Sequence, residues 1–176
     1  DPALAVPAFA QAAAADNKID LRLFPKEDVN RSRGCSLALW QSDRDPHKDR
    51  FAHIFLEDLA KGDARQPARI KIGDQVLQLR RIAVGGKKFG YNTFEYQLYR
   101  AGADGPQIIL DLQLEDSPGE ALDVNGGTLT MVQTGKLPFV ARVKGGAGCM
   151  TPAAAAPPSR QPVQAQKPAA PSADMP

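Results

Sequence analysis

Apolar and polar residues alternate with a period of two along most of the middle of the chain. In the stretch "KIDLRLF", for example, Ile19, Leu21 and Leu23 share one face. This period is typical of β-strands, because successive side chains of a strand point to opposite faces. The segments that follow it are 18–24, 35–41, 68–72, 75–82, 93–100, 107–115, 127–134 and 139–144. Residues 51–57 form a further strand-like run, which is apolar on both faces apart from His53 and Glu57.

Clusters of glycine, proline and asparagine separate these runs and predict the turns between them. Gly73-Asp74 joins two runs directly, and a two-residue connection with glycine is typical of a tight hairpin. The other clusters are Gly85-Gly86, 102–106, Pro118-Gly119, 125–127 and Gly145-Gly146. No segment has the i, i+3, i+4, i+7 apolar stripe of an amphipathic helix. The pattern therefore predicts an all-β fold, a small antiparallel β-barrel or sandwich of about eight or nine strands.

The 176 residues divide into three parts, of which the middle one is the folded domain. Residues 19–149 hold all the predicted strands and are numerous enough to bury one core. Residues 1–18 resemble the end of a secretory signal peptide, with an apolar run and an A-x-A cleavage site at Ala8-Phe9-Ala10. The alternative for this segment is a disordered leader. The signal-peptide interpretation predicts a periplasmic or secreted protein.

The C-terminal segment 150–176 differs in composition from the rest of the chain. It holds seven prolines and eight alanines. Such a segment has too little apolar side-chain area to offset the entropy lost on ordering. We therefore predict a disordered Pro/Ala-rich tail, which acts as a linker, a spacer or a ligand for a partner.

The two cysteines lie far apart, and each follows a glycine. Cys35 opens one predicted strand and Cys149 follows the last one. Neither belongs to a C-x-x-C pair, so the spacing argues against a zinc or redox motif. Two separate buried thiols are the alternative, but a secreted context favours one structural disulfide between them.

Charge is nearly balanced overall and strongly segregated locally. The formal net charge is +2 and 24% of residues are charged, so no global field attracts nucleic acid. No apolar run reaches the roughly 18 residues that span a bilayer. Residues 69–100 carry seven cations and two acids, whereas residues 101–123 carry six acids and no cation. The basic part could meet an anionic polymer, but cross-strand charge pairing is the favoured explanation.

The segment "WQSDRDPHKDRFAH" (residues 40–53) contains both histidines and three aspartates. It fails as a calcium loop, because His47 and Lys48 stand where an oxygen ligand and a glycine are needed. The six-residue spacing of His47 and His53 fits no common zinc motif. No G-x-S-x-G elbow is present, and nothing selects a pair of catalytic acids. We expect a charged connector between strands, with a recognition loop as the alternative, and no metal, cofactor or catalytic site.

The predicted binding residues surround a glycine-rich loop. Two lysines and five aromatic residues stand close together in "VGGKKFGYNTFEYQLY" (residues 84–99), and such mixtures suit protein or glycan recognition. Phe94 and Tyr96 are expected to face the core. The residues predicted to bind a partner are Arg80, Arg81, Lys87, Lys88, Phe89 and Tyr91. The partner is expected to be an envelope protein or an anionic glycan rather than nucleic acid.

The stretch "IGDQVLQLRRIAVGGKKF" (residues 72–89) resembles the strand–loop segment of bacterial periplasmic lysozyme inhibitors, which are small disulfide-closed β-barrels. Their loop carries an S-G-x-x-Y motif, whereas Gly85 to Phe89 has no serine and ends in phenylalanine. The resemblance implies an enzyme-inhibitor function and assigns no cleft-blocking residue. The sequence as a whole predicts an extracytoplasmic, disulfide-closed, non-catalytic β-domain that acts as a binding or structural module. The alternatives are a lysozyme-type inhibitor and an anionic glycan- or lipid-binding module.

Overall fold

The computed structural model describes residues 17–29, 34–59, 67–119 and 121–150. The predicted leader, except for its last two residues, lies outside these ranges. The predicted tail also lies outside them, except for Met150. None of the helices within the described ranges is long and apolar enough to cross a membrane.

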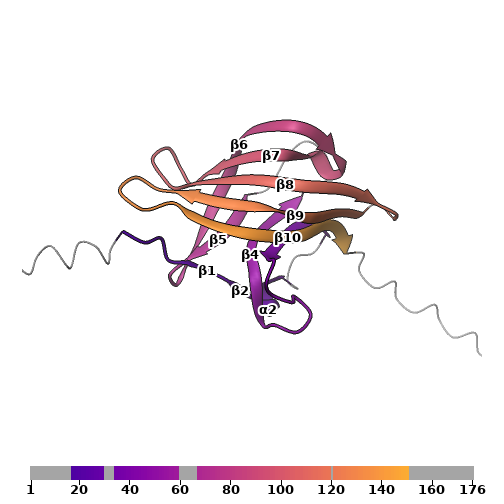
Figure 1. The fold of residues 1–176 in the computed structure, drawn as a ribbon, viewed down its shortest axis with the longest axis horizontal. Helices are drawn as coiled ribbons and strands as arrows, with labels where there is room; N and C mark the ends of the chain where they lie inside the picture. Colours follow the sequence, from indigo (N-terminus) through magenta and orange to yellow (C-terminus); the bar gives the residue numbers. More distant parts are fainter. Residues whose placement is uncertain (1–16, 30–33, 60–66, 120, 151–176) are drawn as a thin grey trace, which may run out of the picture.

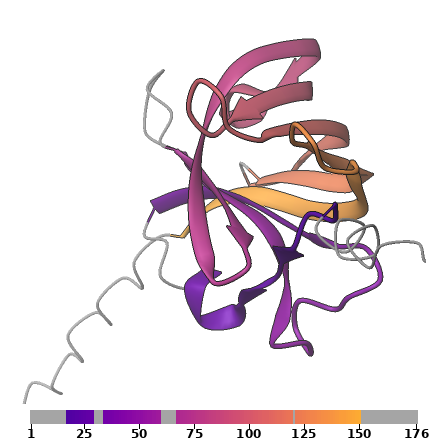
Figure 2. The same ribbon diagram turned by 90° about the vertical axis from the view of Figure 1, so that its left-hand side faces the viewer.

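Eight antiparallel strands form a closed barrel, and consecutive strands are neighbours throughout (Figures 1 and 2). The last barrel strand pairs with the first, which closes the sheet and leaves no free edge in the barrel. The all-β prediction is thus confirmed, and the architecture is a barrel rather than a sandwich. The barrel strands are β3 (Gly34–Gln41), β4 (Phe51–Leu59), β5 (Ala68–Ile72), β6 (Gln75–Phe89), β7 (Thr93–Arg100), β8 (Gln107–Ser117), β9 (Ala121–Val132) and β10 (Phe139–Met150).

Within the described residues, four short elements accompany the barrel. The two-residue strands β1 (Leu21–Arg22) and β2 (Phe24–Pro25) pair with β5 and β4, respectively. A single helical turn, α2 (Lys26–Val29), follows β2. The turn η1 (Gly90–Asn92) connects β6 with β7.

Alternation along the strands fills the barrel interior with apolar side chains. In β8, for example, Ile108, Leu110 and Leu112 are buried, whereas Ile109 and Asp111 are exposed on the outer wall. Strand β4 is buried on both faces from residue 52 to residue 57, as its sequence predicts. Eight-stranded barrels are narrow enough for side chains to fill their interior.

The glycine clusters at 85–86, 126–127 and 145–146 are not turns, contrary to the prediction. They lie inside the long strands β6, β9 and β10, and the pairing of each of these strands shifts register nearby. Glycine inside a strand often marks a bulge or a bend, because it allows close backbone approach and sharp curvature. These clusters therefore bend the wall of the barrel. The predictions at 73–74, 102–106 and 118–119 were confirmed as connections between strands.

The predicted disulfide is confirmed, and it lies at the seam where the barrel closes. Cys35 of β3 and Cys149 of β10 are register partners on adjacent strands, with their Cα atoms 3.8 Å apart. The Sγ atoms are bonded, and the bond joins the first barrel strand to the last. A covalent bond thus reinforces the pairing that closes the sheet.

Candidate binding surfaces

Two open clefts adjoin each other on the outer wall of β7 to β10. Their volumes are about 530 and about 550 Å³, and both are lined by Asp111, Gln113 and Asn125. We call the combined depression the outer groove. Its other polar or aromatic lining residues are Ser42, Glu95, Tyr96, Glu115, Thr128, Arg142 and Lys144.

Glycines in β9 form the floor of the outer groove. A Cβ atom on Gly127 would lie 2.2 Å from the carbonyl oxygen of Asp111, so only glycine allows this close approach. A Cβ atom on Gly126 would lie 3.2 Å from Oε1 of the flexible Gln113 side chain. Gly126 and Gly127 have no side chains, while the residues around them have long polar ones, and this difference in height creates the groove.

The side chains of the outer groove keep most of their hydrogen-bonding capacity free. Two hydrogen bonds involve these side chains: Asn125 Nδ2 donates to Glu115 Oε2 at 2.8 Å, and Glu95 Oε2 accepts from the Lys87 amide at 3.0 Å. Within the described part of the chain, the side chains of Asp111, Gln113 and Arg142 form no hydrogen bond or ion pair, and neither do those of Ser42, Thr128 and Lys144. Exposed polar groups that converge on a cleft without internal partners are suited to bind a ligand.

The strand register sets the order of the groove residues. Tyr96 of β7 faces Asp111 of β8, which faces Thr128 of β9, which faces Arg142 of β10. Side chains of directly opposed residues share one face of a sheet. The row therefore runs across four strands on the outer wall, from an aromatic residue that is 51% exposed to a cation.

The predicted binding residues separate into different environments. Lys87 and Lys88 are exposed near the β6–β7 connection, a region that we call the hairpin end (residues 86–93). The Lys87 ammonium lies 4.9 Å from the centroid of the Phe89 ring. Arg80 is exposed, but it lies seven residues before Lys87 along β6, roughly 20 Å away. The six predicted residues therefore do not form one patch, and their binding role stays a prediction.

Phe89 and Tyr91 pack against the core with partly buried side chains. Tyr91 and Asn92 both have positive φ angles, 57° and 53°. Asparagine tolerates this conformation, whereas a bulky residue rarely adopts it. The Tyr91 hydroxyl lies 3.7 Å from Cys149 Sγ, so Tyr91 fills the space between the hairpin end and the disulfide.

Arg81 belongs to a polar network inside the barrel. Its Nη1 donates to Gln97 Oε1 and to the Asn92 carbonyl, each at 2.7 Å. The Tyr99 hydroxyl donates to Glu57, which is only 1% exposed. Sequence reasoning overlooked this network, although a glutamate in the apolar run 51–57 is a signal for it.

The expectation that Phe94 and Tyr96 face the core is wrong. The inward side chains of β7 are Thr93, Gln97 and Tyr99, all of which are buried. Both faces of β7 carry aromatic residues, so hydrophobicity alone does not select one. Two of these polar groups have partners inside the barrel, since Gln97 Oε1 accepts from Arg81 of β6 and the Tyr99 hydroxyl donates to Glu57 of β4. Among the described residues, the buried Thr93 hydroxyl and Gln97 Nε2 have no hydrogen-bond partner.

Residues 42–50 of the segment 40–53 connect β3 with β4, as predicted, and its two ends belong to these strands. Asp45 organises the turn: its carboxylate accepts from the His47 amide at 2.9 Å, and its own amide donates to Asp49 at 2.7 Å. His47 is exposed, whereas His53 is buried in β4 and packs edge-on against Trp40. Burial lowers the pKa of His53, and the charge of Lys26 lowers it further.

Cross-strand pairing, the favoured prediction, accounts for only part of the basic segment: Arg69 of β5 forms an ion pair with Asp58 of β4 at 3.6 Å. Arg80 directly faces Arg100, and Glu115 directly faces Asp123. Like charges thus oppose one another on neighbouring strands, which is unfavourable in itself. The outer wall consequently has distinct basic and acidic regions.

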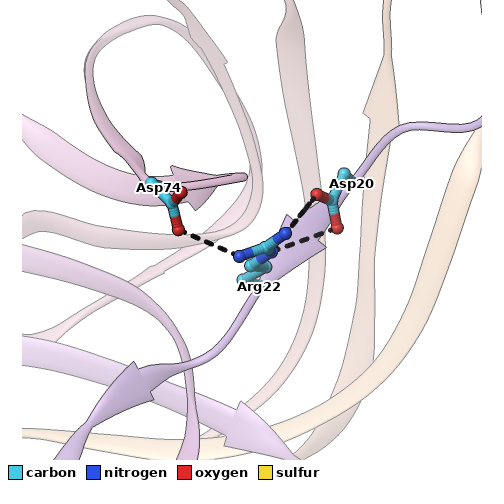
Figure 3. Close-up of polar contacts among 3 residues, drawn as sticks. All are labelled: Asp20, Arg22 and Asp74. Atoms are coloured by element: carbon cyan, nitrogen blue, oxygen red, sulfur yellow. Dashed lines mark hydrogen bonds and ion pairs between the residues drawn. The ribbon is translucent and has the colours of Figure 1, made fainter.

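An exposed ion-pair cluster ties the edge strand β1 to the β5–β6 turn. Arg22 contacts Asp20 at 2.9 Å and Asp74 at 3.0 Å (Figure 3). The hydrogen bond and the charge of Asp20 raise the pKa of Arg22. Because all three side chains are exposed, we assign the cluster a local structural role.

Comparisons of the chain with protein-family models, with curated proteins and with solved structures found no match.

Proposed function

We propose that this protein is an extracytoplasmic, non-catalytic binding module that holds its ligand in the outer groove. One observation carries the proposal: polar side chains, including Asp111, Gln113 and Arg142, which have no partner among the described residues, converge on an open cleft, while the barrel interior is packed with side chains. A barrel whose interior is filled has to bind its ligand on the outside.

The disulfide supports the extracytoplasmic part of the proposal. Disulfides persist in oxidising compartments and are rare in reducing ones. The Cys35–Cys149 bond fits a periplasmic or secreted β-domain. The signal-like segment predicted at residues 1–18 agrees with the same compartment.

A glycine pair tests the groove. Gly126→Leu places a side chain in the groove, whereas Gly148→Leu enters open space on β10, where nothing lies within 4 Å of the added Cβ. Envelope material is separated into protein, glycan and lipid fractions and applied to immobilised full-length protein. We expect one fraction to bind the wild type and Gly148→Leu, and to lose binding to Gly126→Leu. Equal binding to all three proteins, or no binding by any fraction, would contradict the proposal.

Inhibition of a lysozyme-type enzyme is the second candidate function. The exposed Lys87 and Lys88 at the hairpin end favour it, because they could meet an acidic cleft of an enzyme. The test is a lysozyme activity assay with the wild type and with Lys87→Glu/Lys88→Glu. If the protein is such an inhibitor, the wild type should inhibit the enzyme and the charge-reversed variant should not. A lysozyme that the wild type leaves fully active would eliminate this function.

A further inference from the structure

We propose that the ligand of the outer groove is an acidic oligosaccharide whose acid group lies against β10. This inference rests on the proposed function, since it names the chemical class bound at the same site. Three features of the outer groove support it: a set of hydrogen-bonding side chains, an aromatic surface and a pair of cations.

The centre of the groove has the hydrogen-bonding groups that sugar hydroxyls require. A hydroxyl both donates and accepts, and the amides of Gln113 and Asn125 do the same, while the carboxylate of Asp111 accepts only. These three residues line both clefts. Neighbouring hydroxyls of one sugar ring can therefore be bound together.

Tyr96 provides the aromatic surface at the β7 side. Its side chain is 51% exposed and lies beside Asp111 in the strand register. The apolar C–H face of a sugar ring packs well on such a ring, and tyrosine is an amphipathic contact residue with little conformational entropy to lose.

Arg142 and Lys144 provide the positive charge at the β10 side. Neither side chain has an ion-pair partner among the described residues. The guanidinium fork of arginine matches a carboxylate, with two parallel hydrogen bonds. Glu95 and Glu115 lie at the opposite side of the groove, where they would repel a polyanion. This polarity fits a chain with an acid group at one end of the bound segment.

The shape of the groove favours a sugar chain over a peptide. From β7 to β10 it crosses three strand spacings, about 14 Å, which exceeds the length of one sugar ring. A peptide that binds by strand addition needs an unpaired sheet edge, and β7 to β10 are each paired on both sides.

Isothermal titration calorimetry of the disulfide-intact full chain tests the inference. The probes are a tetrasaccharide of alternating N-acetylhexosamine and uronic acid, its carboxyl-reduced neutral analogue, and an acidic peptide of similar length. We expect the acidic tetrasaccharide to bind at least tenfold more tightly than the neutral analogue. Arg142→Gln should remove that preference, and Gly126→Leu should abolish binding. Gly148→Leu should bind like the wild type. Thermal unfolding of each variant verifies its folding.

The outcomes separate this inference from the proposed function. Binding of the peptide but of neither sugar would overturn the ligand class, as would sugar binding that Arg142→Gln and Gly126→Leu leave unchanged. If no probe binds but Gly126→Leu still abolishes binding of an envelope fraction, the groove is the binding site and the proposed ligand class is wrong. If the envelope fraction binds Gly126→Leu as well as the wild type, the groove is not the binding site and the proposed function is wrong.

Discussion

The buried carboxyl group of Glu57 connects two strands inside the barrel through a hydrogen bond. Glu57 is almost fully buried, and a buried carboxyl group is costly unless hydrogen bonds compensate for lost hydration. The hydroxyl of Tyr99 supplies one of these bonds from the opposite side of the interior. The pair therefore links β4 to β7 through the core.

We predict that Tyr99→Phe destabilises the protein by about 1–3 kcal/mol, because Glu57 loses a buried hydrogen-bond donor. Tyr96→Phe, on the exposed face of the same strand, is the matched control and should change stability by less than about 0.5 kcal/mol. Urea unfolding measures both. Equal effects of the two substitutions would contradict the role of the Tyr99–Glu57 bond.

His53 should make stability depend on pH. Its pKa is lowered in the folded protein, so the unfolded chain binds a proton more readily. The free energy of unfolding should therefore decrease as the pH falls through the unfolded value near 6.5, and level off below the folded pKa. His53→Phe, which preserves the packing on Trp40, should remove this dependence, whereas His47→Phe should keep it. A pH profile that His53→Phe leaves unchanged would refute the assignment.

Bends within the long strands give the barrel its curvature, and β10 shows how. A Cβ atom on Gly145 would lie 2.2 Å from the Ala38 carbonyl oxygen, because β10 and β3 approach closely there. Gly148, three residues later in the same strand, has open space around it. Two glycines of one strand thus differ in their surroundings: a side chain at position 145 would clash with β3, whereas one at position 148 would meet no atom within 4 Å.

We predict that Gly145→Ala destabilises the protein by about 1–3 kcal/mol through forced displacement of β3. Gly148→Ala should change the stability by less than about 0.5 kcal/mol. The midpoints of chemical denaturation distinguish the two. A well-tolerated Gly145→Ala would mean that the strands do not approach as closely as described.

The sequence predicted the strands well and their bends poorly. Alternation located nearly every barrel strand, since the interior selects apolar residues at every second position. Asn125-Gly126-Gly127 has the composition of a turn, but glycine is typical of both turns and bulges. The segment is recognised as part of a strand only from its pairing with β8. The same ambiguity hid the outer groove, whose side chains come from β7, β8, β9 and β10 and meet only through their register.

At the scale of the whole molecule, the disulfide stabilises the closed barrel. It spans 114 residues of sequence, a separation for which the chain-entropy model gives an upper value of about 5 kcal/mol. Because the bond lies at the closing seam, its loss removes a constraint on the unfolded chain without removing core contacts. The cysteine pattern and the predicted compartment were sufficient to predict the bond from the sequence.

We predict that Cys35→Ser/Cys149→Ser lowers the melting temperature substantially and retains the β-sheet circular dichroism spectrum. Calorimetry and far-ultraviolet circular dichroism measure the two properties. An unchanged melting temperature would show that the seam is stable without the bond.

We propose that ligand binds on the outer wall of the barrel rather than in the interior or at the hairpin end. Backbone amide chemical shifts, recorded while the protein is titrated with the envelope fraction that binds it, locate the binding surface. We expect the largest changes at the groove positions Gln113, Gly126 and Lys144, with little change at Leu110 inside the barrel. Changes concentrated at Leu110 and its buried neighbours, or at Lys87 and Lys88, would contradict it.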